Sequence, residues 1–471
     1  MRLQQPFTYY AVILSLFLVP LVSYKTYIGP LPLSAEVVMI PLLTIAAIVD
    51  YAQKRIALND FNIKPIAVAF LLYFIIAVIS LTQAVSLAPA AMELARYLSY
   101  VVLFLIVVKV RFTREQYIHF AKVFGLSVLI IGVYGIVQYI FGISLNTAGL
   151  YALKEAKGRV DSTLVNPNYY ASFLNFVIPT LVLLAVVYFK DKKAQLLMFA
   201  LYGIYVINLV LTYTRAAWVA MIGGFVLMVL LIPKDFIKNA VRPHILLSFV
   251  VLLTVVYFMP DVQSRTYSAL YAMQKIVIRH LPMNITDHIA NGDVSQGKDG
   301  GFFAEEPGDE EKVQDEATTS RAVVSRVTLW KTGWVMMKEN PILGVGIGNY
   351  LVRYKDYVTK YPELYIGHDQ YSVHNSYLKV GAETGFIGLA AFLAIYVIYY
   401  VYLLRLYFSA ANRLSKIVVI GLIAGSATFM AQNLSNNLIF IPQLNTIFWL
   451  VSGLAIAFVH QNKEKPASMQ E

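Results

Sequence analysis

Residues 371–404 read YSVHNSYLKVGAETGFIGLAAFLAIYVIYYVYLL. A histidine, an asparagine and a glutamate (His374, Asn375 and Glu383) stand just before an apolar run over 385–404. That run is long enough to cross a bilayer as a helix, since a span needs about 20 mainly apolar residues. Polar side chains gathered at a membrane boundary need a chemical reason. The stretch therefore predicts both a spanning helix and a functional site at the end where it begins.

The composition is that of an integral membrane protein. Of 471 residues, 58% are hydrophobic and only 14% are charged, with a mean hydropathy of +0.64; soluble domains carry about 25% charged residues. The chain has no cysteine, which excludes disulfides and thiolate metal sites. The net charge is +11, but the sequence has no block of basic residues with interleaved aromatics, so we predict no nucleic-acid partner. We attribute the positive charge to cytoplasmic loops.

The apolar runs predict an all-α polytopic fold with about twelve transmembrane helices. The first run, Thr8 to Tyr24, resembles a signal peptide, but no small-x-small cleavage site follows, and we interpret it as an uncleaved first span. The predicted spans are 8–24, 33–50, 65–84, 91–108, 119–141, 168–189, 194–212, 214–232, 243–260, 385–404, 416–434 and 440–459.

Basic residues predict the orientation. With the N-terminus in the cytoplasm, clusters of lysine and arginine near 54–64, 109–114, 190–193, 234–242 and 405–416 all fall inside, and the short outer loops hold far fewer. This asymmetry predicts that both termini are cytoplasmic. The chain then divides into nine spans over 1–260, a long extracytoplasmic loop over 261–384, and three spans with a cytoplasmic tail over 385–471.

The long loop is predicted to be partly helical. Residues 291–319 are rich in Gly, Asp and Glu and are typical of a flexible acidic insertion. Residues 321–340 predict an amphipathic helix, and the sequence GVGIG at 344–348 predicts a turn after it. A second short helix is expected from Asn375 to about Gly385. The predicted apolar face of the first helix consists of Val323, Val327, Trp330, Trp334 and Met337.

Two polar groups precede predicted spans in the first half of the chain. Arg159 is followed by Asn166-Pro167-Asn168, where Asn168 is expected to cap the helix, and a ligand role stays equally open. Arg215 lies between two apolar runs with almost no loop. It is either a snorkelling side chain or, as we favour, a functional boundary charge suited to a diphosphate.

Two further candidates lie in the long loop. Arg326 shares a helix face with Trp330, and taken alone it is more typical of a structural residue. His374 is able to accept a proton near neutral pH, although a lone histidine is more often a hydrogen-bonded structural group. His368 and Asp369 offer a second such site. Neither a His-x-x-x-His pair nor an acidic triad outside the insertion is present, so no metal is predicted.

Together these motifs resemble the bacterial O-antigen ligase and O-antigen polymerase superfamily of polytopic glycosyltransferases, over roughly residues 155–400. The resemblance rests on order and spacing rather than on any one motif. Its parts are Arg159 with Asn166-Pro167-Asn168, Thr214-Arg215-Ala216-Ala217, Arg326 and Trp330 with Pro341 to Tyr350, and His374-Asn375 with Glu383-Thr384-Gly385 and Gly388. The acidic insertion is not part of this motif set.

The resemblance implies transfer of a glycan from an undecaprenyl-diphosphate carrier to an acceptor hydroxyl, at the outer face of the bacterial inner membrane, without metal or cofactor. It implies that Arg215 and Arg326 grip the diphosphate, with Arg159 adding to the cationic rim. His374 is then the residue that orients or deprotonates the acceptor. Asn168, Asn375 and Glu383 are expected to hold loops or the acceptor.

Three functions follow as hypotheses. The first is a polymerase for a surface polysaccharide, with a glycan or glycolipid as acceptor. The second is a ligase that moves finished glycan to lipid A–core or another acceptor. The third is a polysaccharide-lipid transporter or flippase, which typically shows internal repeats and charges at mid-span. The polar groups here gather at one boundary and in one long loop, which favours an enzyme.

Overall fold

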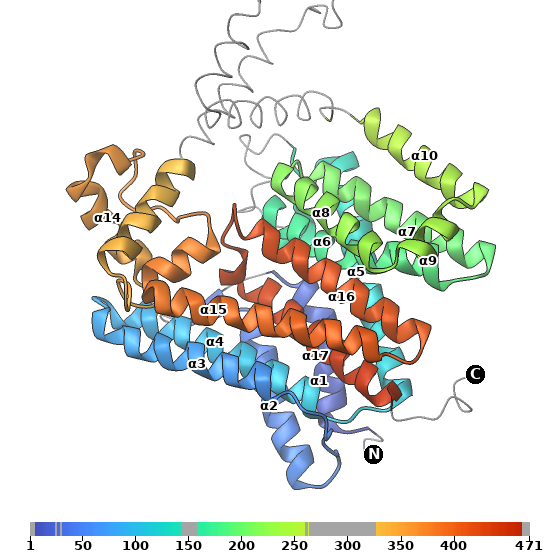
Figure 1. Ribbon diagram of the computed structural model, residues 1–471, viewed down its shortest axis with the longest axis horizontal. Coiled ribbons are helices and arrows are strands. Elements are labelled where there is room, and N and C mark those ends of the chain that lie inside the picture. Colours follow the sequence, from blue (N-terminus) through green and yellow to red (C-terminus); the bar gives the residue numbers. More distant parts are fainter. Residues whose placement is uncertain are drawn as a thin grey trace, which may run out of the picture.

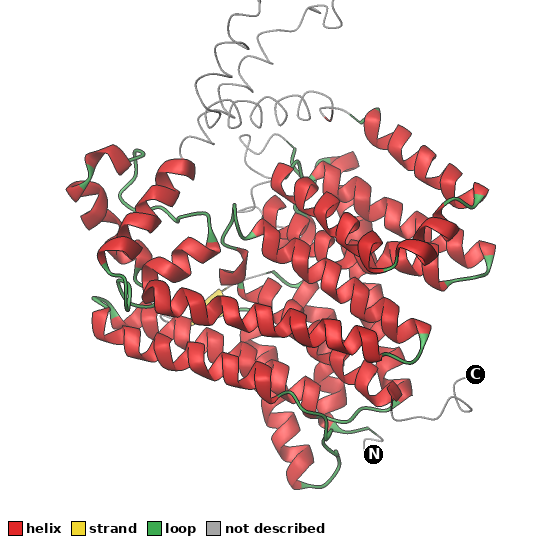
Figure 2. Ribbon diagram, in the orientation of Figure 1, coloured by secondary structure: helices red, strands yellow, loops and turns green. Residues whose placement is uncertain are grey.

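The computed structural model describes residues 5–23, 26–28, 31–143, 158–259, 262 and 326–463. The described part is helical except for one antiparallel hairpin, in which β1 (Thr26–Ile28) pairs with β2 (Leu31–Leu33) (Figures 1 and 2). The longer helices are α1 (Phe7–Leu21), α2 (Ala35–Ala52), α3 (Lys64–Ser80), α4 (Leu87–Lys109), α5 (Arg114–Phe141), α6 (Pro167–Leu183), α7 (Lys192–Leu211), α8 (Arg215–Leu231), α9 (Pro233–Ala240), α10 (Pro243–Tyr257), α14 (Tyr350–Lys360), α15 (Ser376–Ser409), α16 (Arg413–Gln432) and α17 (Pro442–Lys463).

Short helical turns and one further helix complete the described part. Residues 326–339 are helical. The 3₁₀ turns are η1 (Leu81–Gln83), η4 (Ser162–Leu164), η6 (Pro362–Leu364) and η7 (Leu438–Phe440), and η5 (Leu184–Tyr188) is a π-helical turn that continues α6.

The predicted all-α membrane architecture is confirmed, whereas the number twelve is not. Every one of the twelve predicted apolar segments is helical in the structure. Among the described residues, nine helices are long and apolar enough to cross a bilayer. The pair α8 and α9, bent by 108°, makes a tenth if it counts as one broken span. The remaining two, α1 and α10, are apolar but only 15 residues long.

Polar contacts gather several helix ends at one face. Asp50, at the end of α2, accepts hydrogen bonds from the amide and hydroxyl of Thr8 in α1, both at 2.7 Å. Gln461 of α17 donates to the Asn59 side chain at 3.0 Å, and the Asn59 amide donates to the carbonyl of Lys109 at the end of α4. The start of α1 and the end of α17 therefore lie at the same face of the bundle. This is the arrangement expected if both termini are on one side of the membrane.

Helices α6, α16 and α17 form the interior of the bundle. They are the most buried of the candidate spans, while the other spans expose apolar side chains around them. Gly425 of α16 lies so close to α6 that a Cβ there would meet the carbonyl oxygen of Phe176 at 2.3 Å. Gly224 of α8 allows a similar approach to Thr428 of α16. Small residues at such crossings bring helix backbones close, as is typical of membrane bundles.

The segment 326–364 forms a compact module against the opposite ends of α3, α4 and α15, at the upper left of Figure 1. The predicted glycine turn is present, and Gly346 and Gly348 adopt positive φ angles of 94° and 71°. A Cβ at Gly346 would meet Ala84 at 2.6 Å, and one at Gly348 would meet the carbonyl of Pro89. Glycine is therefore required where the turn packs on the start of α4.

The short helix predicted from Asn375 to Gly385 is also present, as the first part of α15. Asn375 caps it, because its Oδ1 accepts from the amide of Leu378 at 3.0 Å. Gly385 breaks the helix with φ 72° and ψ −174°. Its neighbour Phe386 donates its amide to the carbonyl of Pro341 at 2.8 Å. The chain therefore passes from the module over 326–364 to a helix long enough to span a membrane at this glycine.

The predicted apolar face of the helix over 326–339 is wrong in part. Leu329 and Met336 are buried together with Thr332 and the predicted Met337, whereas Val327 and Trp334 are 42% and 49% exposed. The buried face is set by contact with residues 373–378, because Gly333 lies against Val373 and Leu378 there. Val323 and the acidic insertion at 291–319 lie outside the described residues.

Candidate functional site

Arg159 is held in a network at the start of α6 and α8. The amide of Val160 donates to the carbonyl of Leu211 at 3.0 Å, which places the segment beside the end of α7. The Nε of Arg159 donates to the carbonyl of Thr212 at 2.9 Å, and its Nη2 donates to the Thr214 hydroxyl at 3.1 Å and to Asn168 Oδ1 at 3.3 Å. The structure thus brings together two predicted site residues, Arg159 and Asn168.

The sequence predicted Asn168 as the cap of α6, but the cap is Asn166. The Asn166 Oδ1 accepts from the amide of Asn168 at 2.8 Å, and Pro167 occupies the first helical position. The three-residue motif was correctly interpreted as a cap. The residue was misassigned because Pro167 occupies the first helical position, which places the cap two residues earlier than predicted. Asn168 is thereby released to accept from Arg159.

Arg215 is the first residue of α8 and is partly exposed. The turn before it is tight, with Tyr213 at a positive φ of 49°. Thr214, the partner of Arg159, stands directly before Arg215, so both arginines belong to one rim around the N-termini of α6 and α8. Helix N-termini carry partial positive charge, which adds to that of the guanidinium groups. This rim is suited to binding a multiply charged anion.

His374 lies in a second group, with Arg326, Tyr371 and Trp330. The rings of His374 and Tyr371 are 5.6 Å apart, and Tyr371 lies 5.6 Å from His368 in turn. Trp330 Nε1 donates to the carbonyl of His374 at 3.4 Å, and the backbone of His374 has a positive φ of 51°. Positive φ is uncommon for a non-glycine residue, and here the surrounding contacts hold it.

Burial and a neighbouring cation change the pKa of the His374 side chain. Burial lowers the pKa of His374 below its ordinary 6.5, and the positive charge of Arg326 lowers that pKa further. Burial also lowers the pKa of Arg326 below its ordinary value. A guanidinium nevertheless carries its charge at neutral pH in proteins. The pair therefore combines a neutral imidazole, able to accept a proton at neutral pH, with a fixed cation.

Residues 433–437, which follow α16, are hydrogen-bonded to the segment around His374, a contact that the sequence did not predict. Ser376 donates its amide to the carbonyl of Asn433 at 2.9 Å and its hydroxyl to Asn433 Oδ1 at 2.6 Å. The amide group of Asn437 donates to the Ser372 hydroxyl. The signal was available, because QNLSNN at 432–437 is a polar run between two apolar ones. The spans predicted over 416–434 and 440–459 place part of this run inside a helix and the rest in the loop between the two.

Asn375 and Glu383 have structural contacts. Besides capping α15, Asn375 donates to the carbonyl of Leu434 at 3.0 Å. Glu383 is 2% exposed; its Oε1 accepts from the amide of Tyr350 at 3.2 Å and lies 3.7 Å from Lys379 Nζ. Glu383 thus fastens the glycine turn to α15. These residues were expected to hold either loops or the acceptor. The contacts of Asn375 and Glu383 are those of residues that hold loops.

The two groups are linked through α16. That helix packs along α6 and α8, and the segment that follows it bonds to residues 372–376. In Figure 1 the red chain after α16 lies between the orange module and the green helices α6 and α8. In the described part of the chain, no group of three or more His, Asp or Glu side chains is placed to hold a metal ion. Arginine, histidine and helix N-termini are what the site presents.

Comparison with known proteins identifies the domain that contains most of these residues. The family model described as O-Antigen ligase matches residues 196–393. The match contains Arg215, Arg326, His374 and Glu383, whereas Arg159 precedes it. No curated protein matches the chain. The motif resemblance to the O-antigen ligase and polymerase superfamily is thus confirmed over residues 196–393, which carry that family's domain.

Proposed function

We propose that this protein is a metal-independent glycosyltransferase that moves a glycan from an undecaprenyl-diphosphate carrier to an acceptor hydroxyl. We favour a polymerase that extends a surface polysaccharide. The proposal places the enzyme in the bacterial inner membrane, with cytoplasmic termini and the site at the outer face. It also divides the chain into 1–260, 261–384 and 385–471, the middle part being the extracytoplasmic loop. The membrane location and the superfamily support it.

The observation that carries the proposal is the pairing of His374 with Arg326. A sugar hydroxyl is a weak nucleophile, and a neutral imidazole is the group that can take its proton at neutral pH. Arg326 both favours the neutral form of His374 and offers a cation beside it. The reaction attacks a carbon that bears an anionic leaving group. A base assists by taking the proton of the hydroxyl, and a cation assists by stabilising the charge on the leaving group.

The proposed step is a substitution at the anomeric carbon. The acceptor oxygen forms a bond to that carbon while the bond from the carbon to the diphosphate oxygen breaks. The proton of the hydroxyl passes to the His374 ring, and the electron pair leaves with the lipid diphosphate. Arg215 and Arg326 stabilise the charge that grows on the departing oxygens, and Arg159 holds the rim. Charge stabilisation by arginine here takes the place of a metal ion.

A direct assay tests the proposal. Purified protein in nanodiscs is incubated with undecaprenyl-diphosphate oligosaccharide, and product size is followed by gel electrophoresis. A ladder of lengths supports the polymerase. The absence of transfer with every acceptor, together with transport of the lipid-linked glycan across vesicle membranes, would instead support a transporter.

The second candidate is a ligase, and the description of the matching family favours it. The same assay with lipid A–core added separates the two enzymes. Addition of a single block to that acceptor, without a ladder in its absence, identifies a ligase. Both reactions use the same donor and the same site chemistry, so His374 and the arginines are tested equally by either.

A further inference from the structure

Helix α9 lies at the face of the bundle where the described chain begins and ends. Its axis is bent by 108° from that of α8, so α9 runs across the direction of the spans. The hydroxyl of Tyr407 in α15 donates to the carbonyl of Leu231, at the end of α8, at 3.1 Å. Tyr402 of α15 is hydrogen-bonded to His460 of α17 at 2.7 Å. The ends of α8, α15 and α17 therefore share one face, away from the module over 326–364 (Figure 1).

The helix α9 is amphipathic. Phe236 and Asn239 are buried, and the Phe236 ring packs edge-on against Phe225 of α8, with the ring centroids 5.4 Å apart. Lys234 and Lys238 are exposed, one helical turn apart on the same side. A helix of this kind lies in the interface of a bilayer, with its basic side chains at the level of the lipid head groups.

Three basic segments that are separate in the sequence meet at α9. The first includes the start of α7, the second is α9 itself, and the third precedes α10. Helix α9 packs against η5, which ends two residues before the first segment. The side chains of Gln195 in α7 and His244 in α10 are hydrogen-bonded at 2.8 Å, which ties the starts of these two helices together. The basic side chains that these contacts gather, here called the basic patch, are Lys190, Lys192, Lys193, Lys234, Lys238 and Arg242.

The charges of the basic patch are not neutralised by the protein. Five of the six side chains are exposed and Arg242 is half-buried, and none forms an ion pair within the part of the chain that the structure describes. The same segments contain only two acidic residues, Asp191 and Asp235. Asp191 accepts from the amide of Ala194 at 2.9 Å and caps α7. The patch therefore has an excess of positive charge that is open to an anion.

Exposed apolar side chains adjoin the basic patch on the same helices. Leu197, one turn after Lys193 in α7, is 60% exposed. Leu246, one turn after Arg242 in α10, is 51% exposed, and Ile237 of α9 is 54% exposed. Cations bordered by exposed hydrocarbon match an amphiphile, with its anionic group on the patch and its chains along the leucines. A nucleotide or an acidic peptide would use only the charged part of this surface.

Basic residues at this face also serve topology, so the patch is distinguished by its arrangement and not by its charge alone. Lys54, Lys64 and Arg114 are exposed at the same face and have no ion-pair partner among the described residues. Each of them stands at the end of a different candidate span, on α2, α3 or α5. They provide a matched set with equal charge but without a helix that runs across the spans.

We propose that the basic patch binds the head group of an anionic phospholipid, whose acyl chains lie against α7 and α10. The bound lipid belongs to the leaflet on the side of the chain termini, at the other end of α8 from Arg215. Phosphate oxygens accept charge-assisted hydrogen bonds from lysine and arginine, and each basic residue near an anionic membrane surface raises the affinity about fivefold. The inference does not depend on the proposed function, because it uses only the membrane location and the contacts of α9.

Titration of the purified protein in detergent with phosphatidylglycerol, followed by native mass spectrometry, tests the proposal. The patch variant removes one charge from each basic segment by Lys193→Gln, Lys238→Gln and Arg242→Gln. We expect its affinity for the first bound phosphatidylglycerol to be about 100-fold lower than that of wild type. Wild type should bind phosphatidylcholine, which has no net charge, much more weakly.

The control variant removes the same number of charges from the same face by Lys54→Gln, Lys64→Gln and Arg114→Gln. Its affinity for phosphatidylglycerol should fall less than about threefold. All three proteins should unfold at the same temperature without lipid, because the substituted side chains are at the surface. Equal losses in the two variants, or equal binding of phosphatidylcholine and phosphatidylglycerol by wild type, would overturn the proposal.

Hydrogen exchange in wild type locates the bound lipid without any substitution. Phosphatidylglycerol should slow the exchange of backbone amides over 233–246, whereas phosphatidylcholine should not. Glycerol phosphate carries the same phosphate without acyl chains and should give little protection at the same concentration. If glycerol phosphate protects these amides as well as the lipid does, the patch is a site for a soluble phosphate and the lipid assignment is wrong.

Discussion

The two polar groups of the site are built in different ways. Arg159 makes three hydrogen bonds to Thr212, Thr214 and Asn168, so its guanidinium is fixed before any ligand arrives. In the other group, His374 touches its neighbours through ring contacts and charge, and its protonation state follows from burial and from Arg326. Under the proposed function, the first group is a rigid rim that binds the anion and the second is the centre that takes up the proton. Substitutions should therefore affect binding in one group and the proton step in the other.

The sharpest test of this division is His374→Ala. Loss of a general base lowers the turnover number by about 10²–10⁴-fold, and the KM of the donor should change little because the arginines remain. The measurement is steady-state kinetics with purified protein. His368→Ala, in the exposed neighbour of Tyr371, is the matched control and should retain most activity. Equal losses in the two variants would remove His374 from the reaction.

The next largest effect is expected from Arg215→Ala. Removing a preorganised cation from a developing anion costs about 10²–10³-fold in the turnover number, and Arg215→Lys should recover only part of it because lysine lacks the planar fork. Arg353→Ala is the control, since Arg353 is an arginine of the module over 326–364 and is paired with Asp356. Binding of undecaprenyl diphosphate, followed by its effect on thermal unfolding, should weaken only in the Arg215 variants. Unchanged binding would argue for a snorkelling role.

Glu383→Ala should act on stability rather than on the reaction. Without the carboxylate, the buried amide of Tyr350 and the nearby Lys379 lose their partner. Loss of a buried charged hydrogen bond costs about 3 kcal/mol, which should lower the unfolding temperature in detergent by several degrees. Glu383→Gln retains an acceptor oxygen and should recover much of that loss. Normal thermal stability with a 100-fold loss of turnover would instead place Glu383 among the reacting groups.

The smallest expected effect is a shift in pH dependence. Because burial and Arg326 lower the pKa of His374 below 6.5, the base is fully available at neutral pH, and activity should fall only as the pH drops through that lowered value. Arg326→Gln removes the second cause. Residual activity should then begin to fall at a higher pH, closer to 6.5. The measurement is the turnover number as a function of pH. If the decrease at acidic pH occurs at the same pH in Arg326→Gln and in wild type, Arg326 does not influence the protonation of His374.

Sequence patterns predicted the helices better than the contacts between them. Apolar length located all twelve segments, and the glycines at 344–348 and 385 located the turn and the break, because these features are local. The buried face of the helix over 326–339 depends on Val373 and Leu378, which are distant in sequence, so periodicity alone misassigned Trp334. Asn433 and Asn437 were missed for the same reason. Their partners, Ser376 and Ser372, lie more than fifty residues away.

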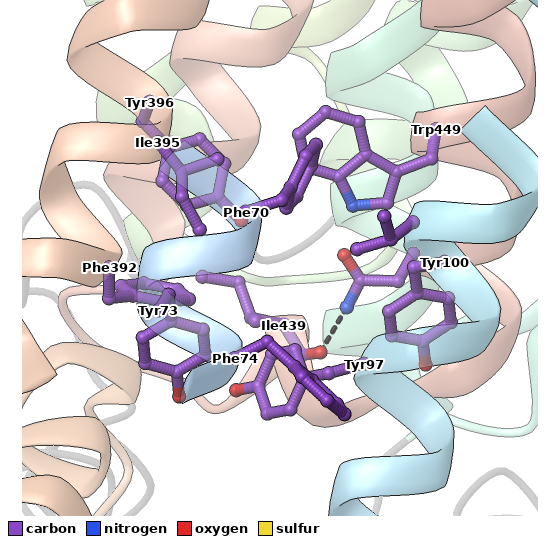
Figure 3. A pocket seen from close by; sticks show the side chains of 12 residues that line it. Phe70, Tyr73, Phe74, Tyr97, Tyr100, Phe392, Ile395, Tyr396, Ile439 and Trp449 are labelled. Atoms are coloured by element: carbon purple, nitrogen blue, oxygen red, sulfur yellow. Dashed lines mark hydrogen bonds between the residues drawn. The ribbon is translucent and has the colours of Figure 1, made fainter. Parts of the chain in front are cut away.

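The cluster of aromatic rings between α3, α4, α15 and α17, drawn in Figure 3, also lay beyond what the sequence alone indicates. Phe70, Tyr100, Phe392 and Trp449 are ordinary residues of apolar spans, and each is typical of packing when taken alone. Only the crossing of four helices brings them to one depth. The motifs of the chain therefore indicate the candidate site, whereas the grouping of these rings follows only from the tertiary structure.

The break at Gly385 separates two mechanical requirements within α15. Ser376 is fastened to Asn433 and Glu383 to Tyr350, so the short segment before the break is fixed at both ends. The long segment after it lies in lipid and must follow the thickness of the membrane, which helices do by tilting. The glycine between them packs against Ile342, and the next residue is bonded to Pro341, so the break sets the direction in which the span leaves the module. The orientation of the segment that carries His374 is therefore set by its own contacts and not by the tilt of the span.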